Sequence, residues 1–192
     1  QQFQRQNHKW FERQVVCRDG ELCIGICPDA SDLIELKNRL IDTSDGYIVE
    51  INSEAKKIAV ALCKHIEAFA GNGLIVDYGY WISLGDTLQS MRHQKTIDIF
   101  AAPGKSDLTA HVDFASLVKD IACQHSKLVP QGQFLERLGI TQRANTLGNY
   151  LTDEALKTHL LAHRRLTHPD EMGTLFKVLS FYPSSSSTPA GF

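Results

Sequence analysis

The sequence contains no long hydrophobic run and no excess of basic residues. No apolar segment approaches the roughly 20 residues that a membrane-spanning helix needs. Lys and Arg number 20 against 22 Asp and Glu, so the formal net charge is −2 and supplies no basic field for nucleic acid or anionic lipid. We therefore expect no nucleic-acid partner and no membrane insertion. The 192 residues, 43% hydrophobic and 22% charged, predict one soluble globular domain.

Cysteine occurs five times, and the C-x-x-C spacing of zinc and redox sites is absent. An odd number in a chain of this length argues against a disulfide framework. Cys17, Cys23 and Cys27 lie in strand-like sequence, where a free thiol behaves as a small apolar residue. We expect reduced structural cysteines and a cytosolic or matrix-like compartment.

A glycine-rich loop that follows a strand and opens a helix, the usual signature of a cofactor site, is also absent. The nearest candidate, Gly71-Asn72-Gly73, follows a helical stretch and precedes a strand, so helix termination explains it better. The chain also begins without Met, in residues that alternate like a strand. This start predicts a fragment, a processed product or a partial chain.

Asp19-Gly20 predicts a β-hairpin within residues 11–27, because both positions of the tight turn need a positive φ. Residues 47–51 are strand-like, and Ser53 can cap a long helix that Gly71 ends. The continuous apolar run at 74–78 is typical of a strand covered on both faces. Strand, helix and strand in this order indicate α/β layering. The apolar positions of the helix are Ala55, Ile58, Ala59, Leu62, Ile66 and Phe69.

The rest of the chain has weaker patterns. Residues 80–110 predict a long ordered loop with short helical pieces, which is usually functional when it occurs. The tail at 184–192 is predicted to be disordered because it has too few apolar residues to bury. We expect helices around 32–41, over 114–122, over 133–138 before Gly139, and over 153–165 after a Thr152 cap, with strands over 127–129 and 175–181.

Asp107, His111 and Asp113 bring two carboxylates and an imidazole close together in the sequence. Their D-x-x-x-H-x-D spacing is not a well-known metal-ligand pattern, and we expect no metal. Asp113 can cap the helix that starts at Phe114, and Asp107 can stabilise a turn. His111 is either a structural histidine or a site residue whose proton a neighbouring carboxylate manages.

Asp77 and Tyr78 leave the end of the strand at 74–78 together, before Gly79. In layered α/β proteins, ligands gather beyond the carboxyl ends of the strands. Asp77 therefore either contacts a ligand or braces the next turn, and its position in the sequence does not decide between the two.

Blocks of unusual sequence follow one another in a recognisable order. The most distinctive ones are VDYGYW at 76–81, GDTLQSMRHQ at 85–94, PGKSDLTAHVDFASL at 103–117, QGQFLERLGITQRANTL at 131–147 and RLTHPDEMGTLFKVL at 165–179. Together they resemble the C-terminal half of the MidA-type methyltransferase family, which includes a mitochondrial complex I assembly factor. WFERQVV at 10–16 and YIVEINSEA at 47–55 fit the family's middle region, so the resemblance covers roughly residues 3–181.

The resemblance implies an α/β fold, namely a Rossmann-like class I methyltransferase with a seven-stranded, mostly parallel sheet. Residues 1–183 would form the C-terminal portion of that single domain. Residues 74–78 would be its fifth strand, and Lys127–Val129 with Leu175–Phe181 its closing antiparallel pair. The hairpin, about 3–27, would be an insertion after the fourth strand.

The resemblance also implies S-adenosylmethionine as methyl donor. In the family, the glycine-rich donor loop and the acidic residue that holds the ribose lie in the N-terminal half. Neither is present in this sequence, so the cofactor-binding residues are expected outside it.

The implied activity is methylation of an arginine in a protein, with a complex I core subunit as the expected partner. The implied location is the cytoplasm in a bacterium or the mitochondrial matrix in a eukaryote, and a homodimer remains open. A non-catalytic interaction or assembly module with the same fold is the main alternative. A metal hydrolase built on Asp107, His111 and Asp113 is a weaker one.

Methyl transfer to an arginine nitrogen needs the nitrogen desolvated, aligned with the methyl group, and held by carboxylates that orient the guanidinium. The resemblance places the DLTAHVDF block and the loop at 85–93 on the substrate side of the cleft. The residues expected to be catalytic are Asp77, Tyr78 and His111. The residues expected to bind the substrate are Asp86, Asp107, Thr109 and Asp113.

Overall fold

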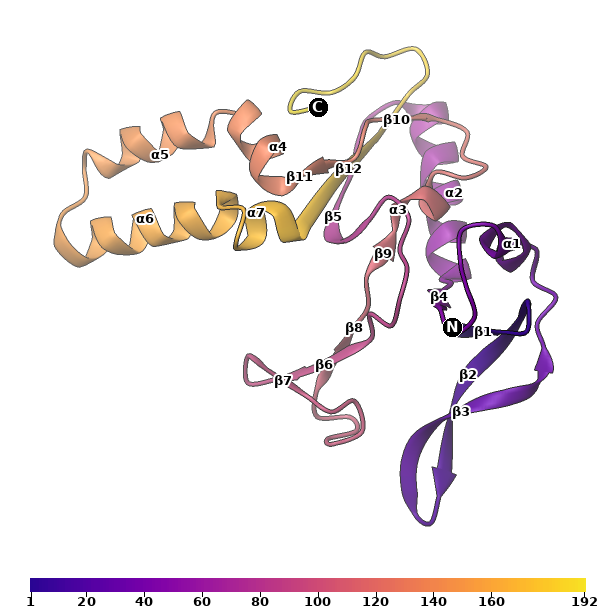
Figure 1. Ribbon diagram of the computed structural model, residues 1–192. Helices are drawn as coiled ribbons and strands as arrows, with labels where there is room; N and C mark the ends of the chain where they lie inside the picture. Colours follow the sequence, from indigo (N-terminus) through magenta and orange to yellow (C-terminus); the bar gives the residue numbers. More distant parts are fainter. The chain divides into compact units, whose positions relative to one another are not determined.

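The computed structural model describes residues 1–192 as a mixed α/β protein (Figure 1). It divides into two compact units: unit 1 comprises Gln1–Ser53 and Ile82–Asp113, and unit 2 comprises Glu54–Trp81 and Phe114–Phe192. None of the helices is both long enough and apolar enough to cross a membrane.

Unit 1 contains an antiparallel sheet with the strand order β3-β2-β1-β4. Its strands are β1 (Gln2–Gln6), β2 (Lys9–Arg18), β3 (Glu21–Ala30) and β4 (Ile48–Glu50). The predicted hairpin is confirmed, with φ values of 52° at Asp19 and 85° at Gly20. A second tight turn at Asn7 and His8 joins β1 to β2. The hairpin is therefore part of a larger sheet, which also includes the strand predicted at 47–51.

The core of this sheet collects apolar side chains from segments far apart in the sequence. Phe3, Trp10, Leu36 and Val49 are buried together, and Leu40 and Ile51 pack against them. Leu36 comes from α1 (Ile34–Lys37), which continues into the 3₁₀ helix η1 (Asn38–Leu40). The short helix predicted around 32–41 is thereby confirmed, and it covers one face of the sheet's core.

The second segment of unit 1, Ile82–Asp113, does not form the loop with helical pieces that the sequence predicts for residues 80–110. It forms an antiparallel sheet with the order β7-β6-β8, followed by the short strand β9 (Val112–Asp113). The strands are β6 (Gln89–Arg92), β7 (Lys95–Ile97) and β8 (Asp107–Thr109). His93 and Gln94 make the turn with φ values of 49° and 61°. The prediction was wrong because a turn without glycine gives no hairpin signal.

Unit 2 is built on β5 (Gly73–Tyr80) and β12 (Phe176–Tyr182), which pair antiparallel from Phe176↔Tyr78 to Phe181↔Gly73. Two short strands, β10 (Gln124–His125) and β11 (Val129–Pro130), also pair antiparallel with β12. The antiparallel pairing predicted between the strands at 127–129 and 175–181 is thus confirmed, although the first strand begins later, at Val129. The chain by itself does not form the expected seven-stranded, mostly parallel sheet, since each of these ladders is antiparallel.

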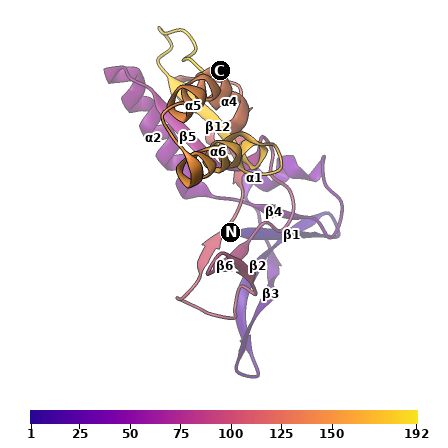
Figure 2. The same ribbon diagram turned by 90° about the vertical axis from the view of Figure 1, so that its left-hand side faces the viewer.

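The helices α2 (Ser53–Phe69) and α4 (Gln131–Arg137) lie on opposite sides of β5 and β12 (Figure 2). On one side, a Cβ added to Gly73 would stand 3.1 Å from Cδ1 of Ile66, so the glycine permits the close approach of α2. On the other side, Val178 clusters with Val129 and with Phe134 of α4. This second cover does not extend over β5, and the expectation that residues 74–78 are covered on both faces is wrong.

The remaining helices of unit 2 are α3 (Phe114–Leu117), α5 (Ile140–Gly148), α6 (Asp153–Thr167) and α7 (Met172–Leu175). The helix predicted over 114–122 ends earlier, at Leu117, and α5 was not predicted. α6 starts after Thr152 as expected, although the Thr152 side chain makes no capping hydrogen bond. The tail, predicted to be disordered, returns to α4, where the rings of Phe192 and Phe134 lie 5.0 Å apart.

Candidate functional site

The two units divide the predicted site residues between them. Unit 1 holds the members of the 85–113 region, and unit 2 holds the pair that follows the apolar run. The predicted site residues in unit 1 are Asp86, Asp107, Thr109, His111 and Asp113. Those in unit 2 are Asp77 and Tyr78.

Glu50, at the end of β4, is the centre of a polar network that the sequence did not reveal. Its Oε1 accepts hydrogen bonds from Nε2 of Gln2 at 2.8 Å and from the backbone N–H of Thr87 at 3.2 Å. Its Oε2 accepts from the hydroxyl of Thr87. The Thr87 hydroxyl oxygen in turn accepts from the backbone N–H of His111 at 2.8 Å. The half-buried Glu50 carboxylate therefore holds Thr87 in place. Through the Thr87 hydroxyl it also holds the backbone of His111, a predicted catalytic residue.

Asp86 lies beside this network and is bound by two side chains of the sheet. Its Oδ1 accepts from Nε2 of Gln2 at 2.8 Å, and its Oδ2 accepts from the Arg13 guanidinium at 2.7 Å. Burial raises the pKa of the Asp86 carboxyl, but the hydrogen bonds from Arg13 and Gln2 outweigh it and leave the pKa below its usual value. Asp86 is thus an ionised anchor of the loop, and its carboxylate is already occupied.

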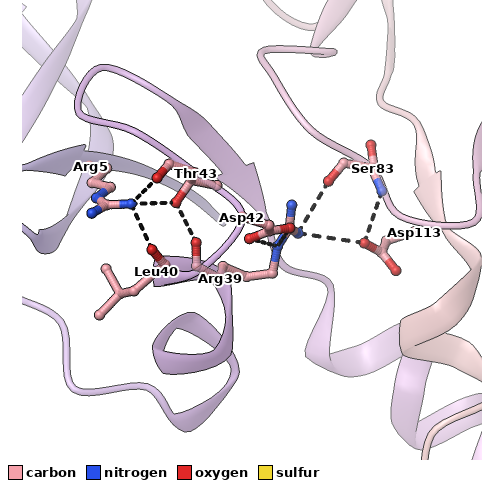
Figure 3. Close-up of polar contacts among 7 residues, drawn as sticks. All are labelled: Arg5, Arg39, Leu40, Asp42, Thr43, Ser83 and Asp113. Atoms are coloured by element: carbon pink, nitrogen blue, oxygen red, sulfur yellow. Dashed lines mark hydrogen bonds and ion pairs between the residues drawn. The ribbon is translucent and has the colours of Figure 1, made fainter.

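Asp113 is held by a second polar cluster in the same unit (Figure 3). Its Oδ2 accepts from the backbone N–H of Ser83 at 3.0 Å and lies 3.9 Å from the Arg39 guanidinium. The same Arg39 nitrogen donates to the carbonyl oxygen of Ser83 at 3.2 Å, while Nε of Arg39 donates to Asp42. Arg39 thereby ties the helical segment after β3 to both ends of the 82–113 segment.

A buried arginine fixes the stretch that carries Arg39 (Figure 3). The Arg5 guanidinium donates to the carbonyl oxygen of Leu40 at 2.9 Å, and to the carbonyl and hydroxyl oxygens of Thr43. Nε of Arg5 lies 3.4 Å from Asp45. Because a buried guanidinium is costly unless its donors are satisfied, this arrangement sets the path of residues 39–45.

Asp107 and Thr109 occupy β8 and differ in their surroundings. Thr109 is half-buried opposite Gln89, whereas Asp107 is exposed opposite Met91. The Asp107 carboxylate takes part in none of the ion pairs of unit 1, unlike that of Asp86 or Asp113. Among the carboxylates predicted to bind substrate, it is the one available to a guanidinium.

Asp77 and Tyr78 end the apolar part of β5 in unit 2. The Asp77 carboxylate accepts from the backbone N–H of Tyr78 at 2.8 Å, and the Tyr78 ring lies 4.3 Å from that of Phe176. Across the ladder, Lys177 stands opposite Asp77 and places its ammonium group 5.2 Å from the Tyr80 ring centre. Burial lowers the pKa of Lys177. This hydrogen bond fits the bracing role, and ligand contact by Asp77 stays a prediction.

The arrangement in unit 1 is therefore a loop held by ion pairs and hydrogen bonds, in which Asp107 is the predicted substrate-binding carboxylate that takes part in no ion pair. Sequence reasoning missed Glu50, Arg39 and Arg5, because their roles arise from contacts across the sheet. The available signal was weak: each is a charged residue next to apolar core positions, in a strand or a short helix.

The described residues contain no group of three or more His, Cys, Asp or Glu side chains placed to hold a metal ion. They also fit the methyl donor poorly. The connection that leads from a strand into a long helix, between β4 and α2, consists of Ile51 and Asn52 and has no glycine. Gly71 and Gly73 lie at the C-terminal end of α2, where free carbonyls rather than amides point outward. This chain alone does not form a glycine-rich cradle for the donor.

Comparison with known proteins identifies relatives of the chain. Residues 1–134 match the family model described as "Putative S-adenosyl-L-methionine-dependent methyltransferase". The "Protein arginine methyltransferase NDUFAF7, mitochondrial" of Xenopus tropicalis is 34% identical over 140 residues, which are 71% of this chain and 33% of that protein. Its Bos taurus counterpart is 30% identical over 193 residues, which cover 94% of this chain and 42% of that protein.

The structural comparison agrees with the sequence comparison. A Burkholderia thailandensis protein crystallised with S-adenosyl-homocysteine superposes with a TM-score of 0.82 and 25% identity, covering 100% of this chain and 52% of that one. A second structure from the same organism has a TM-score of 0.83 and shares the fold at 24% identity. The chain spans about a third to a half of the length of these relatives.

Proposed function

The chain belongs to the family of putative S-adenosyl-L-methionine-dependent methyltransferases, and from that premise we propose that it forms part of a protein arginine methyltransferase. The observation that carries the proposal is the family match over residues 1–134, which includes the Glu50 network and Asp107. The names of the relatives from Xenopus tropicalis and Bos taurus support arginine as the acceptor.

In this proposal the chain supplies the acceptor side of the reaction. Glu50 and Thr87 hold the loop and the His111 backbone in place, while Arg39 and Asp113 hold the two ends of the segment. The exposed Asp107 carboxylate accepts two N–H groups of the substrate guanidinium and orients it. Asp86 and Asp113, whose carboxylates are occupied, act as positioning residues rather than as substrate ligands.

The remaining site assignments are carried forward as proposals. Asp77, Tyr78 and His111 stay proposed catalytic residues, and His111 would take up the proton of the acceptor nitrogen. Thr109 would donate or accept a hydrogen bond next to Asp107. An arginine of a complex I core subunit remains the expected acceptor, and the mitochondrial names of the relatives favour a mitochondrial location.

The test is a chimera in which residues 1–134 replace the matching segment of the Xenopus tropicalis relative. Folding is first established by circular dichroism and by S-adenosyl-homocysteine binding. Mass spectrometry then measures methylation of arginine in proteins of a mitochondrial extract from cells that lack the relative. A folded chimera that binds S-adenosyl-homocysteine but leaves every arginine unmodified would refute the proposal.

The role of Asp107 is tested in the same chimera. A hydrogen bond to a charged group contributes about 1.5–3 kcal/mol. Asp107→Asn is therefore expected to reduce kcat/KM by about 10- to 100-fold. The matched control is Asp29→Asn, at an exposed position of β3 in the same unit, which should leave kcat/KM unchanged. Equal kinetics for the two variants would remove Asp107 from the site.

One observation favours a second function, a non-catalytic assembly module with the same fold. The β4–α2 connection lacks the glycine that a donor cradle needs. Methylation by the chimera separates the two functions, and isothermal titration of the 192-residue chain with S-adenosyl-homocysteine tests whether the chain itself holds a donor site. Micromolar binding would show a donor site in the chain and count against the assembly module, whereas an inactive chimera would favour it.

A further inference from the structure

Two cysteines that are far apart in the sequence meet in unit 2. Cys63 lies in α2, and Cys123 lies in the connection between α3 and β10. The Cys63 thiol donates a hydrogen bond to the sulfur of Cys123, and the Cys63 sulfur accepts one from the backbone N–H of Cys123. Both cysteines are free, so the contact joins two thiols. The fold therefore places two oxidisable sulfurs next to each other.

The pair is enclosed by unit 2. Cys63 is 0% exposed, on the same buried stripe of α2 as Ala59 and Ile66, and Cys123 is 6% exposed. Burial raises the pKa of the Cys63 thiol, and the hydrogen bond to Cys123 raises it further. Cys63 is therefore a protonated thiol at neutral pH, and no repulsion between two thiolates separates the sulfurs.

A second contact between the same two segments shows that the fold sets this approach. Lys56, two helical turns before Cys63 on α2, forms an ion pair at 3.0 Å with Asp120, three residues before Cys123. Asp120 has a φ of 64°, in the turn that follows α3. A disulfide forms without backbone movement only where the two Cβ atoms are close. The N–H of Cys123 reaches the Cys63 sulfur, so the connection already runs close to α2 at this point.

We propose that Cys63 and Cys123 form a redox modification site, at which hydrogen peroxide converts the two thiols into an intramolecular disulfide. In the first step the Cys123 sulfur attacks one peroxide oxygen and becomes a sulfenic acid, while the other oxygen takes the thiol proton and leaves as water. In the second step the Cys63 sulfur attacks the Cys123 sulfur, so that an S–S bond forms and the S–O bond breaks. The released hydroxide takes the Cys63 proton and leaves as a second water. The thiols lose two electrons and two protons in all, and the peroxide gains them.

The difference in burial assigns the two steps. Cys123 keeps the small exposure through which peroxide reaches a sulfur, whereas Cys63 is closed to solvent and faces the Cys123 sulfur. The disulfide ties α2 to the connection before β10. This inference depends neither on the methyl acceptor nor on S-adenosylmethionine, and it is measured without a methylation assay, so its failure and that of the proposed function are distinguishable.

The test uses the reduced 192-residue chain with Cys17→Ser, Cys23→Ser and Cys27→Ser, which remove the other three thiols. Circular dichroism establishes that this variant is folded, and the wild-type chain is treated in parallel. Hydrogen peroxide is added at neutral pH and removed with catalase, and iodoacetamide in denaturant then labels the remaining thiols for peptide mass spectrometry. Two matched controls add either Cys63→Ser or Cys123→Ser, and dimedone traps any sulfenic acid that they form.

We expect the peptides of Cys63 and Cys123 to be joined, without the iodoacetamide label, and together lighter by two hydrogens than the reduced pair. Dithiothreitol should restore both thiols. In the Cys63→Ser control dimedone should label Cys123, whereas in the Cys123→Ser control Cys63 should stay a thiol.

The proposal would be overturned if the joined peptides do not appear under conditions that oxidise the exposed Cys17 of the wild-type chain. A bond that forms only when the peroxide is added in denaturant would also overturn it, because the native contact would then have no part in the reaction. Equal dimedone labelling in the two controls would refute the order of the two steps.

Discussion

Gly173 allows α4, α6 and α7 to meet, and replacing it with alanine tests how tightly they pack. A Cβ added at Gly173 would stand 2.0 Å from the carbonyl oxygen of Thr167 and 2.7 Å from that of His168. Both atoms belong to the backbone at the end of α6, so no side-chain rotation relieves the clash. Gly132 of α4 faces the same carbonyl of Thr167, at 2.4 Å from its added Cβ. The MGTLFK block therefore contains a glycine that the packing requires.

The expected cost follows from the size of the overlap. Overpacking of a core costs about 1–3 kcal/mol, and a backbone clash of this depth belongs at the upper end. Alanine recovers up to about 1 kcal/mol of helix propensity relative to glycine. The net loss is about 2 kcal/mol, which for a chain of this size lowers Tm by about 4–8 °C.

The assay is thermal unfolding followed by circular dichroism, with urea unfolding as a second measure of the free energy. Gly148→Ala in α5 is the matched control, because the nearest atom to its added Cβ is 3.5 Å away and belongs to the Leu156 side chain. That variant should unfold at the wild-type Tm or slightly above it. A Gly173→Ala chain as stable as the wild type would refute the packing described for the three helices.

Two further predictions concern titratable groups. Because the Asp86 pKa is below its ordinary value of 3.8, the stabilisation from its contact with Arg13 is present at neutral pH and is lost as the pH falls below that value. The difference in Tm between wild type and Asp86→Asn should therefore be constant from pH 7 to about pH 5 and shrink towards pH 3; a difference independent of pH would contradict this. Burial raises the pKa of the buried Cys63 thiol to about 12, so iodoacetamide at pH 8 should alkylate the exposed Cys17 and spare Cys63 in the native chain, as peptide mass spectrometry would show. Equal labelling of both cysteines would contradict the burial of Cys63.

The features that the sequence predicted well depend on neighbours in the chain. Asp19-Gly20 makes its hairpin because the turn conformation is a property of those two residues. The long helix α2 and the strand β12 follow from hydrophobic patterns within each segment. The turns at Asn7 and at His93 escaped prediction because residues with side chains occupy the left-handed conformation there.

The candidate site likewise combines residues that the sequence predicted with contacts that only the structure shows. Asp86, His111 and Asp113 were selected from the motifs of a family, and the structure places all three in unit 1. Only the structure shows that the Asp86 and Asp113 carboxylates already accept hydrogen bonds, which is why we propose positioning roles for these two. Glu50, which lies far from Thr87 in the sequence, gave no pattern that singles it out.

By itself, then, the sequence determined the family of the chain, its hairpin and its long helix, since turn preference and periodicity are local properties. Only the tertiary structure decided which carboxylates are occupied and which apolar residues remain exposed. Hydrogen bonding and burial depend on atoms brought together from distant parts of the chain. For that reason the availability of Asp107 and the exposure of Val76 could be recognised only in the folded protein.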